Sequence, residues 1–251
     1  MISTQFDDGI VRITLRAPPL NILTREMLLE LREALRDTAH RRDARVLLLT
    51  ADGKHFSAGA SVEEHLPPTF EQLLDDFTAT VLALHEFPLP VIAAVQGRCL
   101  GGAFELIQAA DIIIAADDAQ FAQPEILLGV FPPIACVLLP RLASPGRAAE
   151  LLFTGDAIDA HAALAAGLVS RIVTRGTLAE QAHELAHRIA RHSAAALRLM
   201  KQAMRAAAGE TARAGIVQAT CTYTDQLMST RDALEGLQAF VQKRAPQWSH
   251  Q

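Results

Sequence analysis

Apolar side chains recur with two different periods along this chain. Residues 11–16 alternate apolar and polar side chains, which predicts a strand with one face in water. Residues 46–49, 91–95 and 112–116 are short and almost entirely apolar, as in strands that are buried on both faces. Residues 24–39 place apolar side chains at helical spacing between charged ones. Strands and helices that alternate in this way predict an α/β fold.

Most of the remaining chain is predicted to be helical. Apolar spacing and helix-favouring residues predict a strand over residues 168–173 and helices over residues 70–84, 147–153, 159–166, 195–208 and 231–243. Pairs of side chains at capping-box spacing mark helix starts: Ser61 with Glu64, Thr69 with Gln72, and Thr177 with Glu180. Since no glycine- or serine-rich linker divides the chain, we expect a core of residues 1–190 that continues into a helical C-terminal region of residues 191–251.

Composition and charge narrow the class of protein. Half of the 251 residues are hydrophobic, enough for one large core, and the formal net charge of −5 offers no overall attraction for nucleic acid. Residues 1–8 are polar and acidic, unlike a signal peptide, and the apolar runs are shorter than a membrane helix needs. Cys99, Cys136 and Cys221 are widely spaced, which fits reduced thiols. We therefore expect a soluble, cytoplasmic protein.

A glycine-rich stretch at residues 97–102 separates the buried strand at residues 91–95 from a helix predicted over residues 103–110. Backbone N–H groups at such a helix start are unpaired and lie at the positive end of the helix dipole, so they can stabilise an oxygen that gains negative charge. Glu105 follows Gly102 by three residues and so lies on the same helix face. An acid in this apolar helix is either a satisfied buried glutamate or part of an active site.

A second acid favours the active site. The strand at residues 112–116 extends for roughly 17 Å, and residues 119–123 are expected to run back over a similar distance. Glu125 can therefore return to the start of the helix that carries Glu105. Two carboxylates in one apolar cleft have their pKa values pushed apart, which suits one to accept a proton while the other donates.

His183 and His187 form a His-Glu-x-x-His pattern, which matches zinc proteases. We reject zinc binding here, because the apolar stripe of the predicted helix places both histidines on the opposite side, toward solvent. No third ligand is assigned either, and a zinc site needs three or four. We therefore expect no metal site.

Three motifs, in this order, resemble those of the crotonase (enoyl-CoA hydratase/isomerase) superfamily. They are Phe-Ser-Ala-Gly-Ala at residues 56–60, Gly-x-x-x-Gly-Gly-x-x-Glu at residues 97–105 and Phe-x-x-Pro-Glu-x-x-x-Gly at residues 121–129. The resemblance continues to residues 235–244 and so covers almost the whole chain. It implies a crotonase-like α/β fold, a spiral of β-β-α repeats with a helical C-terminal trimerisation region. It also implies a homotrimer or hexamer that acts on acyl-CoA thioesters.

The resemblance also implies roles for particular residues. The N–H groups of Ala60 and Gly102 would form an oxyanion hole for the thioester oxygen. Glu125 would exchange a proton with a substrate carbon, and Glu105 would position and deprotonate water. No metal or redox cofactor is implied, because CoA arrives as part of the substrate. The implied substrate-binding residues are Ala58, Gly59, His65, Gly101, Phe131, Pro133, Phe240 and Lys243, of which the last two often reach CoA across a subunit boundary. Lys243 would otherwise be an ordinary surface lysine.

Three departures from the usual family pattern concern the substrate. Ser61 stands where the family often has aspartate, residues 96–100 read Gln-Gly-Arg-Cys-Leu, and residues 131–136 replace a glycine-rich turn with bulkier side chains. All three resemble the hydratases of cyclohexa-1,5-diene-1-carbonyl-CoA in anaerobic benzoyl-CoA degradation. A closed apolar wall suits a compact ring better than a long flexible chain. One alternative is an ordinary short-chain enoyl-CoA hydratase. The other is a relative that binds RNA or protein with little catalysis, and the acidic net charge and the presence of both glutamates disfavour this second alternative.

Overall fold

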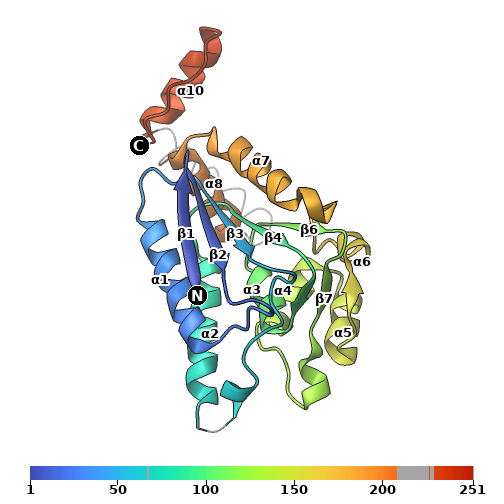
Figure 1. Ribbon diagram of the computed structural model, residues 1–251. Helices are drawn as coiled ribbons and strands as arrows, with labels where there is room; N and C mark the ends of the chain where they lie inside the picture. Colours follow the sequence, from blue (N-terminus) through green and yellow to red (C-terminus); the bar gives the residue numbers. More distant parts are fainter. Residues whose placement is uncertain (67, 208–225, 227–228, 251) are drawn as a thin grey trace.

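A six-stranded sheet forms the centre of the computed structural model, which describes residues 1–66, 68–207, 226 and 229–250 (Figure 1). In spatial order its strands are β1 (Ile2–Asp7), β2 (Ile10–Leu15), β3 (Val46–Ala51), β4 (Val91–Val95), β6 (Ile112–Ala116) and β9 (Arg171–Val173). The β1–β2 pair is antiparallel, and the other neighbouring pairs are parallel. The strands that the sequence predicts to be buried are the parallel centre of this sheet.

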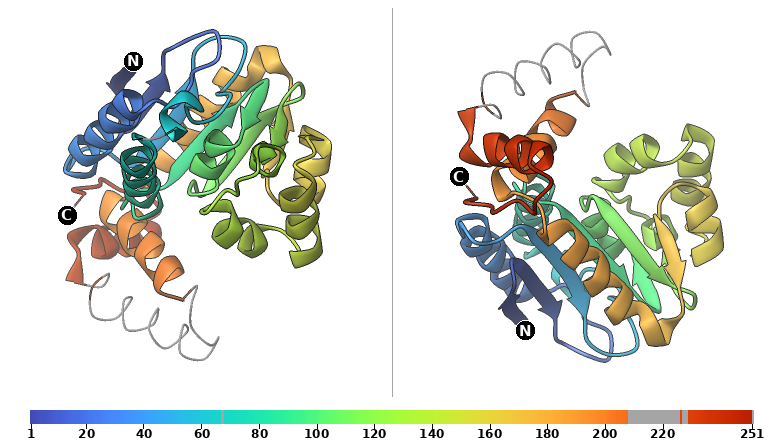
Figure 2. Two further views of the ribbon diagram at one scale, coloured as in Figure 1. Left: turned by 90° about the horizontal axis from the view of Figure 1, so that it is seen from below. Right: turned by 90° about the horizontal axis from the view of Figure 1, so that it is seen from above.

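Helices cover both faces of the sheet. α1 (Arg25–Ala39), α2 (Phe70–His85) and α3 (Gly102–Ile107) pack on one face, and α7 (Leu178–Ala190) crosses the other (Figure 2). Successive side chains of β4 enter the two apolar cores alternately. Both faces are therefore dry, which explains why the central strands are apolar at every position.

The prediction of one wet face for β2 is wrong. Thr14 is buried, and its hydroxyl lies 2.8 Å from the Thr50 hydroxyl on β3, within hydrogen-bonding distance. Arg12 is partly buried, and its Nη2 lies 3.4 Å from Nδ1 of His183 on α7. Because α7 covers this side of β2, protein groups rather than water satisfy its polar side chains.

A second, small sheet brings distant segments together. β5 (Arg98–Leu100) pairs in parallel with β7 (Gln120–Ala122), and β7 pairs antiparallel with β8 (Ile158–Asp159). A parallel bridge links Ser57 to Cys99. The segment expected to run back, residues 119–123, therefore leaves the main sheet and joins β5, which brings it to the start of α3.

The remaining predicted helices are present with small shifts at their ends, whereas α4 is not predicted by the sequence. The predicted helices are α5 (Pro145–Thr154), α6 (Ala160–Ala165), α8 (Ala194–Ala207) and α10 (Arg231–Val241), and the unpredicted one is α4 (Ala135–Leu142). α8 is tied to the segments that lead into β4 and β6, since Lys201 Nζ donates at 2.5 Å both to Asp111 Oδ2 and to the Leu89 carbonyl. The division of the chain at residue 190 stays a prediction.

The predicted capping boxes are wrong in most of their contacts. Ser61 Oγ accepts from the Glu64 N–H at 3.3 Å, but the Glu64 carboxylate turns away to accept from the Arg25 N–H at 2.9 Å. The Glu64 carboxylate thus caps the start of α1 instead of its own turn. Thr69 and Thr177 make no capping hydrogen bond to the helices that follow them.

The prediction that His183 and His187 project toward solvent is confirmed only in part, because both are partly buried and each contacts a side chain from the first two strands or the turn between them. His183 contacts Arg12, and His187 Nε2 lies 3.3 Å from the carboxylate of Asp8, because the turn between β1 and β2 reaches α7. In the part of the chain that the structure describes, no group of three or more His, Cys, Asp or Glu side chains could hold a metal ion. Over the same residues, no helix is both long and apolar enough to cross a bilayer.

Candidate active site

Glu105 lies in α3, whose six residues are all buried. Its side chain is 3% exposed, and its Oε1 accepts hydrogen bonds from the N–H groups of Ile134 and Ala135, both at 2.9 Å. These amides begin α4, so the carboxylate caps that helix. Burial, partly opposed by the Ala135 N–H and reinforced by the charge of Glu125, raises the pKa of Glu105 to about 7.

Glu125 reaches the same place from η2 (Pro124–Leu128), a 3-10 turn directly after β7. A side-chain carbon added at Gly101 would lie only 2.8 Å from Glu125 Oε1, so this carboxylate rests against the backbone at the start of α3. Burial raises the pKa of Glu125 as well. The structure therefore brings both carboxylates to the turn between β5 and α3.

Gly101 makes this turn possible. Its φ of +52° and ψ of −129° are open only to glycine, and the Glu125 carboxylate occupies the space where a side chain would start. The Gly101 N–H donates to the Ala122 carbonyl at 2.9 Å, which ties the turn to β7. The same glycine thus admits the carboxylate and holds the strand that delivers it.

The N–H groups of Ala60 and Gly102 lie beside each other. A side-chain carbon on Gly102 would come within 3.3 Å of the Ala60 nitrogen and 3.2 Å of the Phe77 ring. Neither N–H has an acceptor among the described residues. Ala60 is fixed by a bridge to Leu23, whose carbonyl accepts from the Ser61 N–H at 3.1 Å. Two adjacent, unpaired donors are the arrangement that an oxyanion requires.

Other predicted binding residues flank these donors. Gly59 is buried, and a side-chain carbon there would lie 2.8 Å from the Leu100 carbonyl. Ala58 beside it is partly exposed. His65 is exposed in the 3-10 turn η1 (Glu63–His65), where its Nδ1 lies 2.7 Å from the Ser61 carbonyl oxygen.

The segment before α4 faces both carboxylates. Phe131 and Pro133 are exposed in the single chain. Cys136 is exposed too, but the partial loss of water around its sulfur, together with the negative charges of Glu105 and Glu125, raises the pKa of its thiol. A charge effect from both acids means that the first turn of α4 lies close to both.

Phe240 and Lys243 lie apart from this site in their own chain. Phe240 belongs to α10, and Lys243 follows that helix with an exposed side chain and a φ of +55°. α10 lies at the far end of the molecule from α3 and α4 (Figure 1). Their predicted role at a neighbouring subunit stays a prediction, and Cys221 lies outside the described residues.

The sequence interpretation missed Gln123, a fully buried side chain between β7 and Glu125. With its amide nitrogen toward Glu125, Gln123 donates to Oε1 at 3.3 Å and to Oε2 at 3.2 Å, while its oxygen accepts from Gln108 Nε2 at 3.0 Å. The one available signal was a glutamine that directly follows a buried apolar strand.

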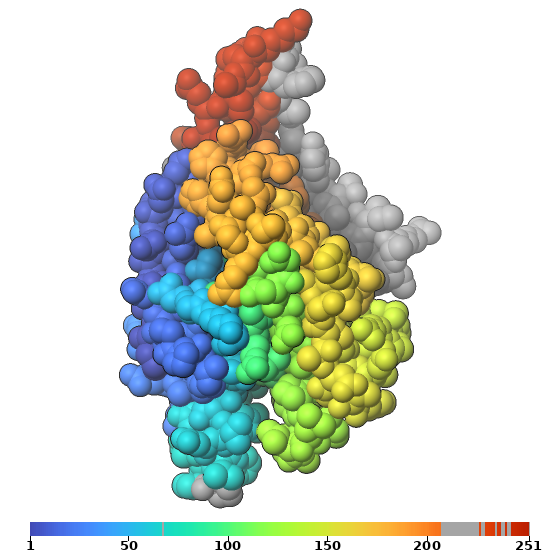
Figure 3. All heavy atoms as spheres, turned by 45° about the vertical axis from the view of Figure 1, so that its right-hand side comes forward, coloured from blue at the N-terminus to red at the C-terminus, as the bar shows by residue number. Residues whose placement is uncertain are grey.

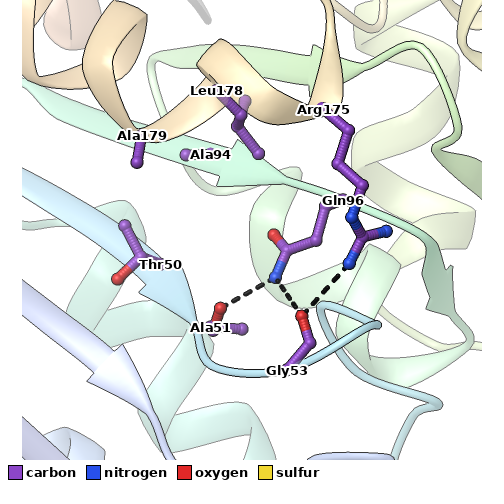
Figure 4. A pocket seen from close by; sticks show the side chains of 8 residues that line it. All are labelled: Thr50, Ala51, Gly53, Ala94, Gln96, Arg175, Leu178 and Ala179. Carbon is purple, nitrogen blue, oxygen red and sulfur yellow. Dashed lines mark hydrogen bonds between the residues drawn. The ribbon is translucent and has the colours of Figure 1, made fainter.

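A separate small pocket lies on the α7 side of the sheet (Figure 4). Gln96 donates to the Ala51 carbonyl at 2.8 Å, and Arg175 donates to the Gly53 carbonyl at 3.3 Å. The pocket is lined by Thr50, Ala51, Gly53, Ala94, Gln96, Arg175, Leu178 and Ala179. None of the predicted site residues is among them, so this pocket is distinct from the paired carboxylates.

Two exposed apolar segments flank the carboxylates. One follows Ala60 and the other is η2, and Figure 3 shows them as neighbouring lobes with an indentation between them. Their exposed apolar side chains are Val62, Leu66, Ile126, Leu127 and Leu128. An apolar surface beside two unpaired amides and two acids fits a ligand with an apolar acyl group and a polar carbonyl.

Known proteins agree with this arrangement. A family model described as enoyl-CoA hydratase/isomerase matches residues 5–251. Cyclohexa-1,5-dienecarbonyl-CoA hydratase from Thauera aromatica is 36% identical over 97% of this chain and 94% of its own length. A probable enoyl-CoA hydratase from Mycobacterium leprae is 37% identical over 97% of this chain and 96% of its own. The solved enoyl-CoA hydratase from Bacillus anthracis is 35% identical, with a TM-score of 0.93 over 100% of this chain and 99% of that one. The chain has the crotonase fold and belongs to the enoyl-CoA hydratase/isomerase family.

Proposed function

We propose that this protein adds water to cyclohexa-1,5-diene-1-carbonyl-CoA, a conjugated cyclic dienoyl thioester. Family membership supports hydro-lyase activity of the enoyl-CoA hydratase type. The cyclic substrate is the more specific part of the proposal. The product would be a hydroxycyclohexene-carbonyl-CoA, as in benzoyl-CoA degradation.

The site residues divide the chemistry between them. The N–H groups of Ala60 and Gly102 bind the thioester oxygen and stabilise the charge that it gains as water adds. Glu105 takes a proton from the water, whose oxygen bonds to one end of the conjugated system. Glu125 gives a proton to the other end, and the remaining C=C bond shifts between them. Electron pairs move only within substrate and water, so the proposed reaction uses no metal or redox cofactor, and CoA belongs to the substrate.

The segment at residues 131–136 carries the choice of substrate. Ordinary enoyl-CoA hydratases have a glycine-rich turn at this position. This chain instead has Pro133, Ile134 and Cys136 beside the two carboxylates. Side chains in place of bare backbone reduce the room for a long acyl chain and favour a compact ring. The Thauera aromatica and Mycobacterium leprae relatives are equally similar overall, so an ordinary short-chain enoyl-CoA hydratase is the second candidate.

The deciding measurement is kcat/KM for the cyclic dienoyl-CoA and for crotonyl-CoA on one enzyme preparation. We expect the cyclic substrate to be preferred, and the double variant Pro133→Gly, Cys136→Gly to reduce that preference by roughly five- to a hundredfold, the scale of a few methylenes in a pocket. The Glu105→Gln variant, purified in the same way, controls for contaminating host hydratases. Faster hydration of crotonyl-CoA by the wild type would leave the ordinary hydratase as the better assignment.

We also propose a cytoplasmic homotrimer or hexamer, without nucleic-acid or membrane partners, in which Phe240 and Lys243 serve the CoA of a neighbouring subunit. The exposed Lys243 supports this, because it follows α10, a helix that lies far from α3 and α4 in its own chain (Figure 1). Light scattering should give a multiple of three subunits, and Lys243→Ala should raise KM for CoA esters more than it lowers kcat. A fully active monomer would contradict the shared site.

A further inference from the structure

Two buried amide side chains stand behind Glu125. Gln123 is fully buried at the end of β7, and Gln108, at the end of α3, is 4% exposed. Three oxygens surround one side of the Gln123 amide, namely both carboxylate oxygens of Glu125 and the Gly101 carbonyl, and Gln108 Nε2 lies on the other side. Only an amide that turns its NH2 toward the oxygens satisfies both sides.

This orientation makes Gln123 the side chain that holds Glu125. Its NH2 reaches both carboxylate oxygens and lies 3.3 Å from the Gly101 carbonyl. In the described part of the chain, no other side chain donates to Glu125. Glu125 itself lies on a short 3-10 turn whose next three residues are exposed, so the turn alone does not fix its carboxylate.

Gln108 supports this arrangement at a cost. Its Oε1 is buried and has no hydrogen-bond partner among the described residues. A buried, unpaired carbonyl is unfavourable, and an apolar side chain of the same length would avoid it. The useful part of Gln108 is therefore its Nε2, which donates to the Gln123 oxygen at 3.0 Å and so keeps the Gln123 NH2 turned toward Glu125.

We propose that Gln123, oriented by Gln108, is a positioning residue that fixes the Glu125 carboxylate and lowers its affinity for the proton that it gives to the substrate. Donors to a carboxylate stabilise its charged state, so removing them raises the proton affinity of the acid. The effect on turnover rests on the proposed hydratase function, whereas the effect on the carboxylate does not.

The first test is the titration of Glu125 in the free enzyme by NMR of ¹³C-labelled glutamate side chains, with the Glu125 signal assigned by its loss in Glu125→Gln. In Gln123→Met, which keeps length but has no donor, we expect titration about one pH unit higher than in wild type. In Gln108→Met, which removes an unpaired oxygen, we expect a smaller shift in the same direction. Gln96→Met is the matched control, because it removes another buried glutamine whose amide donates to backbone far from the glutamates, and it should leave Glu125 unchanged.

The second test is turnover. Gln123→Met should lower kcat about tenfold with KM changed by less than about twofold, and should move the limb of the pH–rate profile that belongs to Glu125 to higher pH. Unchanged titration of Glu125 in Gln123→Met would overturn the proposal. If that variant does not fold, unchanged titration in Gln108→Met would do so. A wild type that hydrates no enoyl-CoA would instead overturn the proposed function and leave the titration to decide the role of Gln123.

Discussion

The two glutamates are held by different kinds of partner. Glu105 lies in a buried helix, and two backbone N–H groups at the start of α4 fix its carboxylate. Glu125 lies on a turn with exposed neighbours, and the side chain of Gln123 faces its carboxylate. Backbone donors remain after any substitution except one to proline, whereas the donor of Gln123 is lost when its side chain is replaced. The environment of Glu105 is therefore set by the fold, and that of Glu125 by particular side chains.

The largest effect should come from removing either acid. Under the proposed function each of these acids transfers a proton, so Glu105→Gln and Glu125→Gln should each lower kcat by roughly a hundredfold or more, while binding of CoA esters changes little. Glu184→Gln, an exposed change on α7, is the control. Near-wild-type kcat in either active-site variant would remove that residue from the mechanism.

The next effect concerns stability and pH. The pKa of Glu105 is raised from its ordinary value of 4.5 to about 7, so the folded state binds the proton more tightly than the unfolded state. The proton on Glu105 therefore adds roughly 3 kcal/mol to the free energy of unfolding below pH 4.5, and this contribution is lost as the pH rises through about 7. Glu105→Gln has no such proton, so denaturant melts at about pH 5 and pH 8 should show wild type losing stability relative to this variant. A pH-independent difference would contradict the raised pKa.

Gly101→Ala should disturb Glu125 and leave the contacts of Glu105 in place. The new side chain would meet Glu125 Oε1 at 2.8 Å and displace it, so kcat should fall about ten- to a hundredfold. Gly129→Ala is the control, because that glycine also has a positive φ, of +77°, but open space around it. Both variants should lose stability through backbone strain, and only Gly101→Ala should lose turnover. Equal turnover in the two variants would mean that the contact with Glu125 is unimportant.

The smallest effect uses Cys136 as a reporter of the two charges. Its thiol pKa is raised by burial and by both glutamates, so alkylation at neutral pH should be slow. Glu105→Gln and Glu125→Gln should each speed up the alkylation of Cys136 about threefold, because each removes a negative charge near the thiol. Mass spectrometry of the peptide that contains Cys136 measures the rate. The buried Cys99 should stay unmodified and serves as the check on folding.

Local patterns predicted the elements well and the contacts between them less well. The central strands and long helices follow from apolar periodicity, which survives folding because both faces of the sheet are covered. α4 escaped prediction because Pro140 lies inside it and prolines precede it. Glu64 shows why capping failed, since its carboxylate found the start of another helix, 39 residues away in the chain, instead of its own.

The site was predictable as far as motifs carried it. The family motifs named Glu105 and Glu125, and the structure brings their carboxylates to one turn. Gln123 and Gln108 were not predictable, because their pairing exists only once β7 leaves the main sheet and joins β5. Such a contact depends on the arrangement of two sheets and leaves no local pattern.

The unpaired N–H groups of Ala60 and Gly102 have a consequence for laboratory evolution. They belong to the main chain, so every member of a substitution library that folds and has no proline at position 60 or 102 would inherit both donors. Under the proposed function, substitutions at Glu105, Glu125 or the first turn of α4 would meanwhile change which proton is transferred and which acyl group fits. Selection could then yield enzymes for other reactions in which a thioester oxygen becomes charged, because the two donors proposed to bind that oxygen would already be present.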